Sequence, residues 1–520
     1  MKTLPIGPFL GINNRLPDFA LHVHDKGDYV RTADNVDLTN AGTFIRRQDA
    51  TLVQAMSGAH SLHGDYLVRD SVLYKVTLPT YSETLVRVLS SNNPMSYVEF
   101  NGDLYFANGT DFGRISNGTA YPLALPTPAS PNVATIPGSL SAGWYQVATQ
   151  YINQDTGEEG GASPSSNYEL AANSALRVTL PAATTGATHV RVYVSTVNGS
   201  IPLLQTTVTA STASVDITAI TIGREANQRY EAPLPAGKLF LFNGCLCSYK
   251  DGNVYEGLPF RPGYYLPVEG RIPFPATVTN VVPAQNGVFV VADKTYWIQG
   301  PRMTTSEMIQ DVLPYGGVAG TEFSSPNKSL YGWFSHKGIV LGTPQGEVQA
   351  VMSDNLDVVV PESGFSTLFE DGGYRRVVSC GYCLNLDNLG ATTYSGWDFT
   401  SISGNYGTKA DGIYQLGGGL ADATVYLGSI DFGAENIKHM PAVYLSYSSA
   451  EKLNIRIATP SNDEFEYAAR ACSDDIKMHR VDTGRGLRAN WFGMTITNTD
   501  GADFALASVS FAPIASQRRI

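Results

Sequence analysis

Short apolar runs separated by tight polar turns recur along most of the chain. In four places two such runs flank a turn dipeptide: Asn101-Gly102, Asn243-Gly244, Asn286-Gly287 and Lys337-Gly338. Asn-Gly favours a type I′ turn, because both central residues need a positive φ. The glycines of the last three dipeptides follow one another after 43 and 51 residues. That spacing of short strands is typical of β-propeller blades.

The same pattern predicts how the chain is divided. We expect an N-terminal arm at residues 1–57 and propeller blades at residues 58–125 and 230–418. Between the two propeller parts, residues 126–229 begin with a Pro-rich stretch and continue with evenly spaced aromatic and β-branched strands. This pattern of evenly spaced strands predicts an inserted β-sandwich that resembles a fibronectin type III module. Residues 422–520 predict a C-terminal β-sandwich.

The fold class expected from these patterns is therefore all-β: a discontinuous β-propeller with an inserted sandwich and a C-terminal sandwich. No segment shows helical periodicity over more than about ten residues. The chain has 520 residues, 43% of them hydrophobic and 16% charged, with 51 Gly and 28 Tyr. The low charge and the many turn-forming and aromatic residues favour the all-β prediction.

Charge and terminal sequence exclude several classes of protein. The net charge of −12 argues against a general nucleic-acid binder, and we expect no sequence-specific nucleic-acid binding. The N-terminus lacks the apolar core of a signal peptide, and no apolar run of about 18 residues predicts a membrane span. The five cysteines, an odd number, fit reduced thiols. We therefore expect a protein that folds in a cytoplasm.

Candidate chemistry is sparse. The pairs Cys245/Cys247 and Cys380/Cys383 could together form a zinc site, but each lies in a strand-like apolar run where cysteine acts as a small hydrophobe. The segment 22–24 holds two histidines without a visible third ligand. No catalytic motif stands out, and nothing selects a carboxylate pair for glycoside hydrolysis. We accordingly expect no catalytic residues, no metal and no cofactor, and a protein that is not an enzyme.

The most basic segment lies near the C-terminus. Its three arginines and a neighbouring tryptophan are candidates for a protein interface: Arg480, Arg485, Arg488 and Trp491. A phosphate-binding role for the same arginines is the alternative.

Several segments resemble virion structural proteins of tailed bacteriophages. They are residues 11–15 (Gly-Ile-Asn-Asn-Arg) and 35–47, residues 254–262 and 290–300, and the end of the chain at residues 484–504 and 518–520. The resemblance covers most of the chain outside the inserted sandwich. It implies a tail component with a propeller core, such as a tail-tip, baseplate or nozzle protein.

That family implies a function and partners. The chain would be a scaffold for tail assembly and host attachment, located in the virion tail and assembled in the host cytoplasm. Its partners would be other phage tail proteins, including copies of itself in a ring, and a host surface receptor. The alternative function is a receptor- or glycan-binding tail module, and a hydrolase of surface polymers ranks third.

Overall fold

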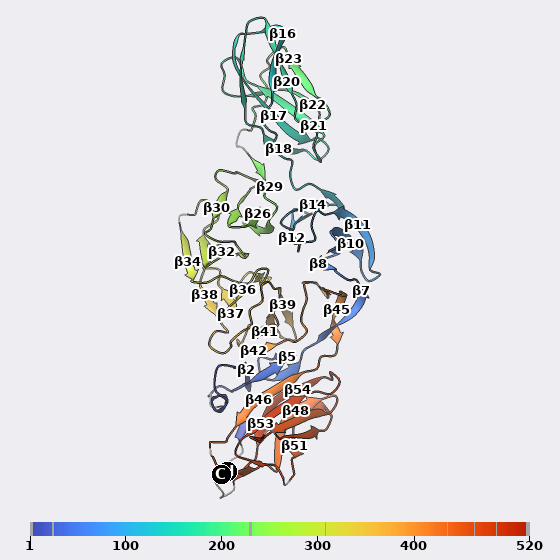
Figure 1. Ribbon diagram of the computed structural model, residues 1–520, viewed down its shortest axis with the longest axis vertical. Coiled ribbons are helices and arrows are strands. Elements are labelled where there is room, and N and C mark those ends of the chain that lie inside the picture. The colour runs from blue at the N-terminus through green and yellow to red at the C-terminus, as the bar shows by residue number, and fades with distance from the viewer. Residues whose placement is uncertain are drawn as a thin grey trace.

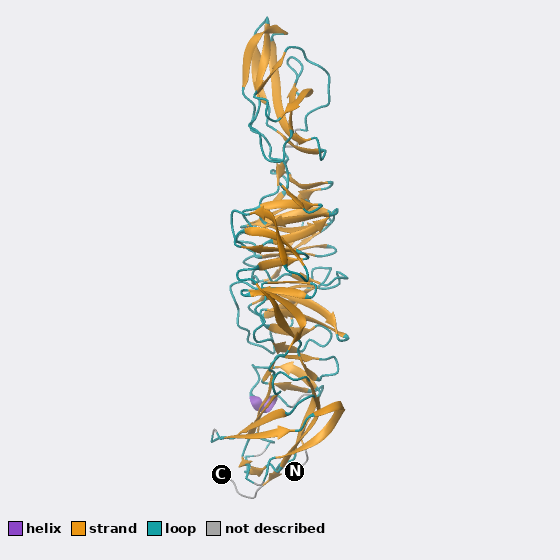
Figure 2. Ribbon diagram, turned by 90° about the vertical axis from the view of Figure 1, so that its right-hand side faces the viewer, coloured by secondary structure: helices purple, strands orange, loops and turns teal. Residues whose placement is uncertain are grey.

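The computed structural model describes residues 4–22, 25–227, 231–306, 308–433, 435–461, 463–484 and 486–515. Within them the chain is built of strands, and the one helical element is a 3-10 turn, η1 (Asp18–Ala20). The prediction of an all-β protein is confirmed. Figures 1 and 2 show three tiers along one long axis: the inserted sandwich at one end, the propeller in the middle, and the second sandwich at the other end.

Seven blades form the propeller in the described part of the chain: six are separate four-stranded antiparallel sheets, and one is the four-stranded antiparallel end of a nine-stranded sheet. The first three blades are β8 (His60–His63) to β11 (Ser82–Val88), with β9 (Tyr66–Arg69) and β10 (Val72–Thr77); β12 (Ser96–Phe100), β13 (Asp103–Ala107), β14 (Phe112–Ser116) and β15 (Thr119–Tyr121); and β25 (Lys238–Phe242), β26 (Cys245–Lys250), β27 (Asn253–Tyr255) and β30 (Arg271–Pro273).

The remaining four blades continue around the ring. They are β31 (Asn280–Pro283), β32 (Gly287–Val291), β33 (Thr295–Gln299) and β34 (Ile309–Leu313); β35 (Phe323–Ser324), β36 (Tyr331–Ser335), β37 (Gly338–Gly342) and β38 (Val348–Ala350); β39 (Ser366–Asp371), β40 (Tyr374–Ser379), β41 (Tyr382–Asn385) and β42 (Ala391–Thr393); and β43 (Ser401–Ser403), β44 (Tyr406–Lys409), β45 (Gly412–Gly419) and β7 (Asp49–Ala55).

The turn dipeptides Asn101-Gly102 and Asn243-Gly244 each lie between the first and second strands of a blade. Asn101 and Gly102 have φ values of 52° and 84°, and Asn243 and Gly244 have 46° and 75°, as a type I′ turn requires. Each of these turns reverses the chain from the innermost strand of its blade, β12 or β25, to the second strand. The polar turn residues therefore mark where successive blades begin.

The propeller core lies between blades. Clusters of buried apolar side chains join neighbouring blades, and the cluster between the fourth and fifth blades contains Phe289, Trp297 and Trp333. The Phe289 ring lies 4.5 Å from that of Trp297 and 5.5 Å from that of Trp333, centroid to centroid. Because the faces of each sheet are covered by its neighbours, the strands read as nearly continuous apolar runs.

The ring is closed by strands from distant parts of the chain. Strand β7 pairs antiparallel with β45 and so supplies the outer strand of the last blade, while β43 packs against β8 of the first blade. The segment that we expected as a separate N-terminal arm is thus built into the fold. The partner of β7 lies hundreds of residues away, so no local pattern in the sequence reveals it.

The other N-terminal strands belong to the terminal sandwich. One of its sheets has the order β5 (Val36–Leu38), β6 (Phe44–Arg46), β54 (Phe504–Phe511), β48 (Ala442–Ser449) and β51 (Cys472–Asp482), with β1 (Leu4–Ile6) also paired to β54. The second sheet contains β4 (Thr32–Asp34), β46 (Thr424–Ile430), β53 (Phe492–Thr497), β49 (Leu453–Ala458) and β50 (Glu464–Ala469).

This second sheet is continuous with the propeller. Strand β4 pairs in parallel with β42 of the sixth blade and antiparallel with β46, which joins blade and sandwich into one nine-stranded sheet. Figure 1 shows the N-terminal strand β5 lying between the propeller and the C-terminal strands. Hydrogen bonds of the sheet ladder therefore run from the propeller into the sandwich.

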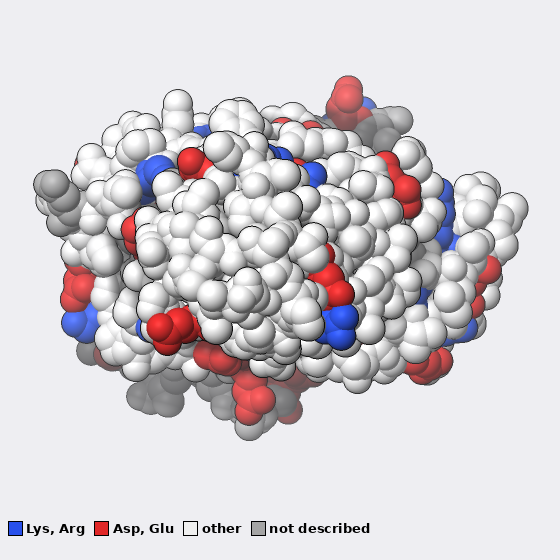
Figure 3. All heavy atoms as spheres, turned by 90° about the horizontal axis from the view of Figure 1, so that it is seen from above, with Lys and Arg blue, Asp and Glu red and all other residues white. Residues whose placement is uncertain are grey.

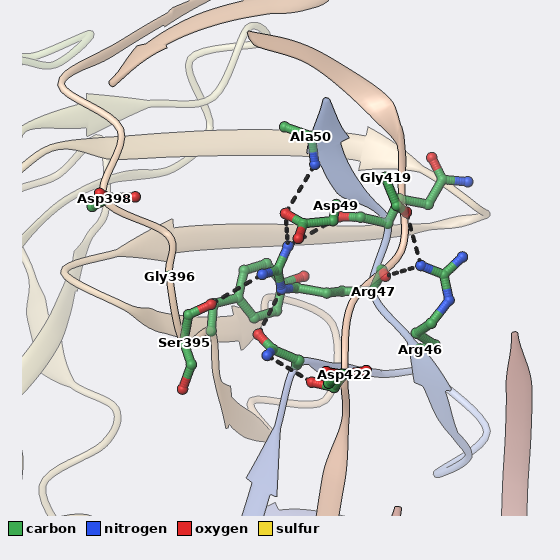
Figure 4. Close-up of polar contacts among 12 residues, drawn as sticks. Arg46, Arg47, Asp49, Ala50, Ser395, Gly396, Asp398, Gly419 and Asp422 are labelled. Atoms are coloured by element: carbon green, nitrogen blue, oxygen red, sulfur yellow. Dashed lines mark hydrogen bonds and ion pairs between the residues drawn. The ribbon is translucent and has the colours of Figure 1, made fainter. Parts of the chain in front are cut away.

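Arginine side chains brace the crossing of the N-terminal segment from sandwich to propeller, as Figure 4 shows. Arg47 donates from Nε to Asn35 Oδ1 at 2.7 Å, from Nη1 to Asp49 Oδ1 at 2.7 Å and from Nη2 to the Ser395 carbonyl at 3.0 Å. Arg46 donates from Nη1 to the Gly419 carbonyl at 3.0 Å. The guanidinium groups thus tie together chain segments from both domains.

The inserted sandwich packs two sheets around its own core. One sheet has the order β16 (Val133–Leu140), β20 (Ser174–Thr179), β23 (Ser214–Ile217); the other contains β18 (Glu158–Ala162), β17 (Gly143–Asn153), β21 (His189–Val194) and β22 (Leu203–Thr209), with β19 (Ser166–Leu170) also on β17. Its likeness to a fibronectin type III module stays a prediction.

Three small sheets complete the described strands. They are β2 (Phe9–Ile12) with β3 (Asp28–Val30); β24 (Ala232–Pro233), β29 (Arg261–Tyr265) and β28 (Gly257–Leu258); and β52 (Arg488–Ala489), β47 (Lys438–His439) and β55 (Ile514–Ala515). The second of these lies where the inserted sandwich meets the propeller. There Arg261 donates to the Glu159 carbonyl at 2.6 Å and pairs with Glu231 at 2.7 Å.

Candidate functional site

A cavity of about 670 Å³ opens on one face of the propeller. We call it the axial cavity, because its wall is made by the segments that lead into the innermost strands of six blades. These segments are residues 93–94, 237–238, 277–279, 319–320, 363–365 and 399–400, joined by the turns at 108–109 and 249–251. Ligand sites commonly form where such loops converge on one face of a scaffold.

The charged groups of the axial cavity are two ammonium groups and one carboxylate. Lys250 is anchored, since its Nζ donates to the Gly109 carbonyl at 2.8 Å. The Lys238 Nζ lies 6.0 Å from the centre of the Tyr249 ring, a cation–π distance. Among the ion pairs of the described residues none involves Lys238, and Asp251 is exposed at the rim. The lining thus carries a net positive charge.

Tyr249 forms an apolar floor with a polar end. Its ring is 5% exposed, and its hydroxyl lies 3.3 Å from the Thr279 carbonyl, to which it donates. Burial, and after it the charge of Glu322, raise the pKa of Tyr249 well above its usual value. The phenol is therefore a hydrogen-bond donor at every physiological pH. One oxygen of Glu322, Oε2, is buried without a hydrogen-bond partner.

The interface candidates from the sequence lie in the terminal sandwich, away from the axial cavity. Arg480 stands on β51 with 57% of its side chain exposed and pairs with Asp482 at 2.7 Å. Arg488 begins β52, opposite His439 of β47, and is exposed, whereas Trp491 is half-buried. Arg485 lies outside the described residues. Arg480 and Arg488 belong to different sheets, and no contact between them is among those described.

The sequence patterns did not identify any residue of the axial cavity as a candidate. Lys238 and Tyr249 lie at the two ends of the hairpin whose turn is Asn243-Gly244. They are directly opposite each other in the pairing of β25 with β26. That pairing could have been found from the turn. The remaining wall could not, since its segments are spread over about 300 residues of the chain.

The described residues contain no group of three or more His, Cys, Asp or Glu side chains that could hold a metal ion. Cys245 and Cys247 are buried on β26 of the third blade, and Cys383 is buried on β41 of the sixth. Of the 22–24 segment, His22 is described, with Nε2 3.0 Å from the Leu427 carbonyl, while His24 lies outside the described residues. No helix in the described part of the chain is long and apolar enough to cross a membrane.

No protein-family model and no curated protein sequence matches the chain. Among solved structures it is similar to a glycoside hydrolase family 43 arabinoxylan arabinofuranohydrolase from Bacillus subtilis, at 10% identity and a TM-score of 0.23, covering 81% of this chain and 96% of that one. An exo-β-1,3-galactanase from Phanerochaete chrysosporium gives 12% identity, coverages of 88% and 96%, and a TM-score of 0.16.

A third match is the extracellular domain of a putative hybrid two-component system from B. thetaiotaomicron, at 10% identity and a TM-score of 0.24, with 92% of each chain covered. The presence of glycoside hydrolases among the matches corrects one expectation. We expected a protein that is not an enzyme, and this exclusion is wrong, because enzymes stand among the solved structures that match the chain. Matches at these TM-scores assign no catalytic residue here.

Proposed function

We propose that the chain is a structural component of a bacteriophage tail, in a tail tip, baseplate or nozzle, where it supports assembly and host attachment. The resemblance of its terminal and propeller segments to tail proteins is one support. The observation that carries the proposal is the nine-stranded sheet that runs from the sixth blade into the terminal sandwich. A ladder shared by two domains resists bending and rotation at their junction, as a scaffold part requires.

The terminal sandwich offers a surface for assembly. Strands β50 and β51 form edges of its two sheets and contact each other. Large apolar side chains are exposed along them: Phe465 at 38%, Ile476 at 42% and Met478 at 62%. Exposed apolar side chains on edge strands favour association with another chain. We assign this edge, together with Arg480, to contacts with neighbouring tail subunits.

A second candidate function is receptor or glycan binding through the inserted sandwich. Glu158 and Glu159, near one end of β17, contact the propeller through Arg114 and Arg261. Trp144 lies at the other end of this eleven-residue strand, about 30 Å away. It is 52% exposed. An exposed aromatic ring at a free tip suits contact with a host surface.

The surface of that end supports the same reading. Figure 3 looks down on the molecule from the inserted sandwich and shows a mostly uncharged face with scattered side chains of both signs. Binding there would depend little on salt, because no patch of one charge dominates the view.

The mass of the purified protein and its place in particles test the main proposal. Light scattering with negative-stain images measures the oligomer, and immunogold labelling of purified phage particles locates the protein. We expect label on the tail, and an oligomer that Met478→Asp dissociates. Met308→Asp is the matched control, since Met308 is 52% exposed on the propeller. A protein absent from the particles would refute the proposal.

The second candidate function needs a different assay. Binding of labelled protein to host cells should fall in Trp144→Ala and stay unchanged in Met308→Asp, the control variant on the propeller. If the Trp144→Ala variant binds host cells as well as the control variant does, the inserted tip is not the receptor site. That result would not affect the tail proposal.

A further inference from the structure

We infer that the axial cavity is a binding site for a saccharide that carries a carboxylate group. Its position, its net positive lining, the Lys238 ammonium group, for which no hydrogen bond or ion pair is found among the described residues, and its open face carry this inference together. The site is distinct from the sandwich edge and the inserted tip, so it does not rest on the proposed tail function.

The size and lining of the cavity fit a sugar. A volume of about 670 Å³ is in the range of small-molecule sites. Apart from the three charged residues, the polar side chains in the lining are amides, hydroxyls and the phenol of Tyr249. Three of them, Asn93, Thr277 and Ser363, are exposed. Half-buried Phe365 supplies an aromatic face against which the C–H groups of a sugar ring can pack.

Lys238 selects the charge of the ligand. Lys250 is held by the Gly109 carbonyl, and exposed Asp251 is at the rim, whereas Lys238 is half-buried over Tyr249. An ammonium group that is partly removed from water and lacks a carboxylate partner favours an anionic ligand. A carboxylate placed there would form a charge-assisted hydrogen bond that a neutral sugar cannot form.

The backbone at Gly320 passes close to this ammonium group. A Cβ added at Gly320 would lie 3.6 Å from the Lys238 Nζ and 2.8 Å from the Gly364 carbonyl oxygen. Gly320 has a φ of 82°, and its N–H donates to Asn280 Oδ1 at 2.9 Å. Only glycine reaches this conformation without strain, so the chain approaches the cavity closely at this point.

A ligand can reach the cavity. Figure 1 views the propeller face-on, and Figure 2 shows the two sandwiches extending from opposite edges of the disc, so neither covers a propeller face. A cavity on the propeller face therefore opens to solvent beside the long axis of the molecule.

Two matched sugars test the inference on the full-length protein. Methyl β-D-glucuronide and methyl β-D-glucoside differ by a carboxylate in place of a hydroxymethyl group, and inorganic phosphate serves as the simple anion. Titration calorimetry, with saturation-transfer NMR for weak binding, gives the affinities. We expect the glucuronide to bind about 10- to 100-fold more tightly than the glucoside, the worth of one charge-assisted hydrogen bond.

Variants then locate the site. Lys238→Gln should bring the glucuronide affinity down to that of the glucoside, while Lys294→Gln should leave it unchanged, since Lys294 pairs with Asp311 elsewhere on the propeller. Phe365→Ala should lower the affinity for both sugars. This variant locates the site if Lys238→Gln does not fold. Equal affinity for the two sugars, binding that survives Lys238→Gln, phosphate binding as tight as the glucuronide, or no binding of either sugar would each overturn the inference.

Discussion

Replacing Arg47 with methionine should open the junction between propeller and terminal sandwich. The Arg47 side chain is 2% exposed and donates to Asn35, Asp49 and the Ser395 carbonyl (Figure 4). Its guanidinium carbon also lies 5.0 Å from the centre of the Tyr394 ring. Methionine keeps the apolar stem but leaves these acceptors without their donor.

The magnitude follows from burial. Removing one partner of a buried ion pair costs about 3–5 kcal/mol. The lower end applies, because the Asp49 side chain is 28% exposed and water can partly replace the lost donor. A cost of about 3 kcal/mol corresponds to about a 100-fold rise in the population of locally opened molecules. The effect should concentrate on β7 and β45, whose pairing starts next to Arg47.

Hydrogen exchange read by mass spectrometry measures this opening peptide by peptide. Peptides covering residues 49–55 and 412–419 should exchange about 100-fold faster in Arg47→Met, while peptides of the inserted sandwich stay unchanged. Arg177→Met is the matched control, because that arginine forms an exposed pair with Asp216. The reasoning is refuted if the β7 and β45 peptides exchange in Arg47→Met as they do in the unaltered protein.

Three further predictions concern other parts of the molecule. Cys472 should be alkylated before the buried cysteines, and His479→Gln should slow its reaction, because His479 Nε2 lies 3.1 Å from the Cys472 sulfur; equal rates in peptide mass spectra would contradict this. Phe289→Ala should destabilise the propeller by about 3–5 kcal/mol in calorimetry, since the ring is fully buried; an unchanged propeller transition would show that this core is not tightly packed. Burial works against ionisation of Asp18, but hydrogen bonds from Arg31 and Ser429 outweigh it and lower the carboxyl pKa, so its stabilisation is full above about pH 4 and is lost as pH falls through the lowered value. The melting-temperature difference between Asp18→Asn and the unaltered protein should therefore shrink toward pH 3, and a constant difference would refute the assigned sign.

The turns made much of the propeller predictable. A type I′ reversal needs residues that accept positive φ, so Asn101-Gly102 and Asn243-Gly244 stand out locally. Lys337-Gly338 also marks a turn, and Gly338 has a φ of 83°. Asn286-Gly287 is less regular, because neither residue has a positive φ. Local turn chemistry therefore placed these blades in the sequence.

Pairing between distant segments was not predictable in the same way. Strand β7 reads as a short strand, but nothing in residues 49–55 says that its partner is β45, more than 350 residues later. Likewise β1 pairs with β54 at the other end of the chain. A single sequence records the propensity of each strand, while the choice of partner depends on packing of the whole domain.

The candidate site depends on the same long-range order. Lys238 could be seen as a lysine at the start of a strand, which is an ordinary surface position in sequence. Its role in the axial cavity comes from Tyr249 on the paired strand and from Gly320, two blades further on. The cluster of basic residues around Arg480 predicted an interface from composition alone. In the structure, Arg480 already forms an ion pair with Asp482.

These pairings give the chain a nested order. The terminal sandwich is formed from both ends of the chain, the propeller is inserted within it, and the second sandwich is inserted within the propeller. Each junction is therefore crossed twice by the backbone, and side chains reinforce each crossing: Arg47 at one junction and Arg261 at the other. Two crossings restrict rotation more than a single linker does. A long molecule built this way keeps its inserted tip and its assembly edge at a fixed separation, which a part that connects a host surface to a tail needs.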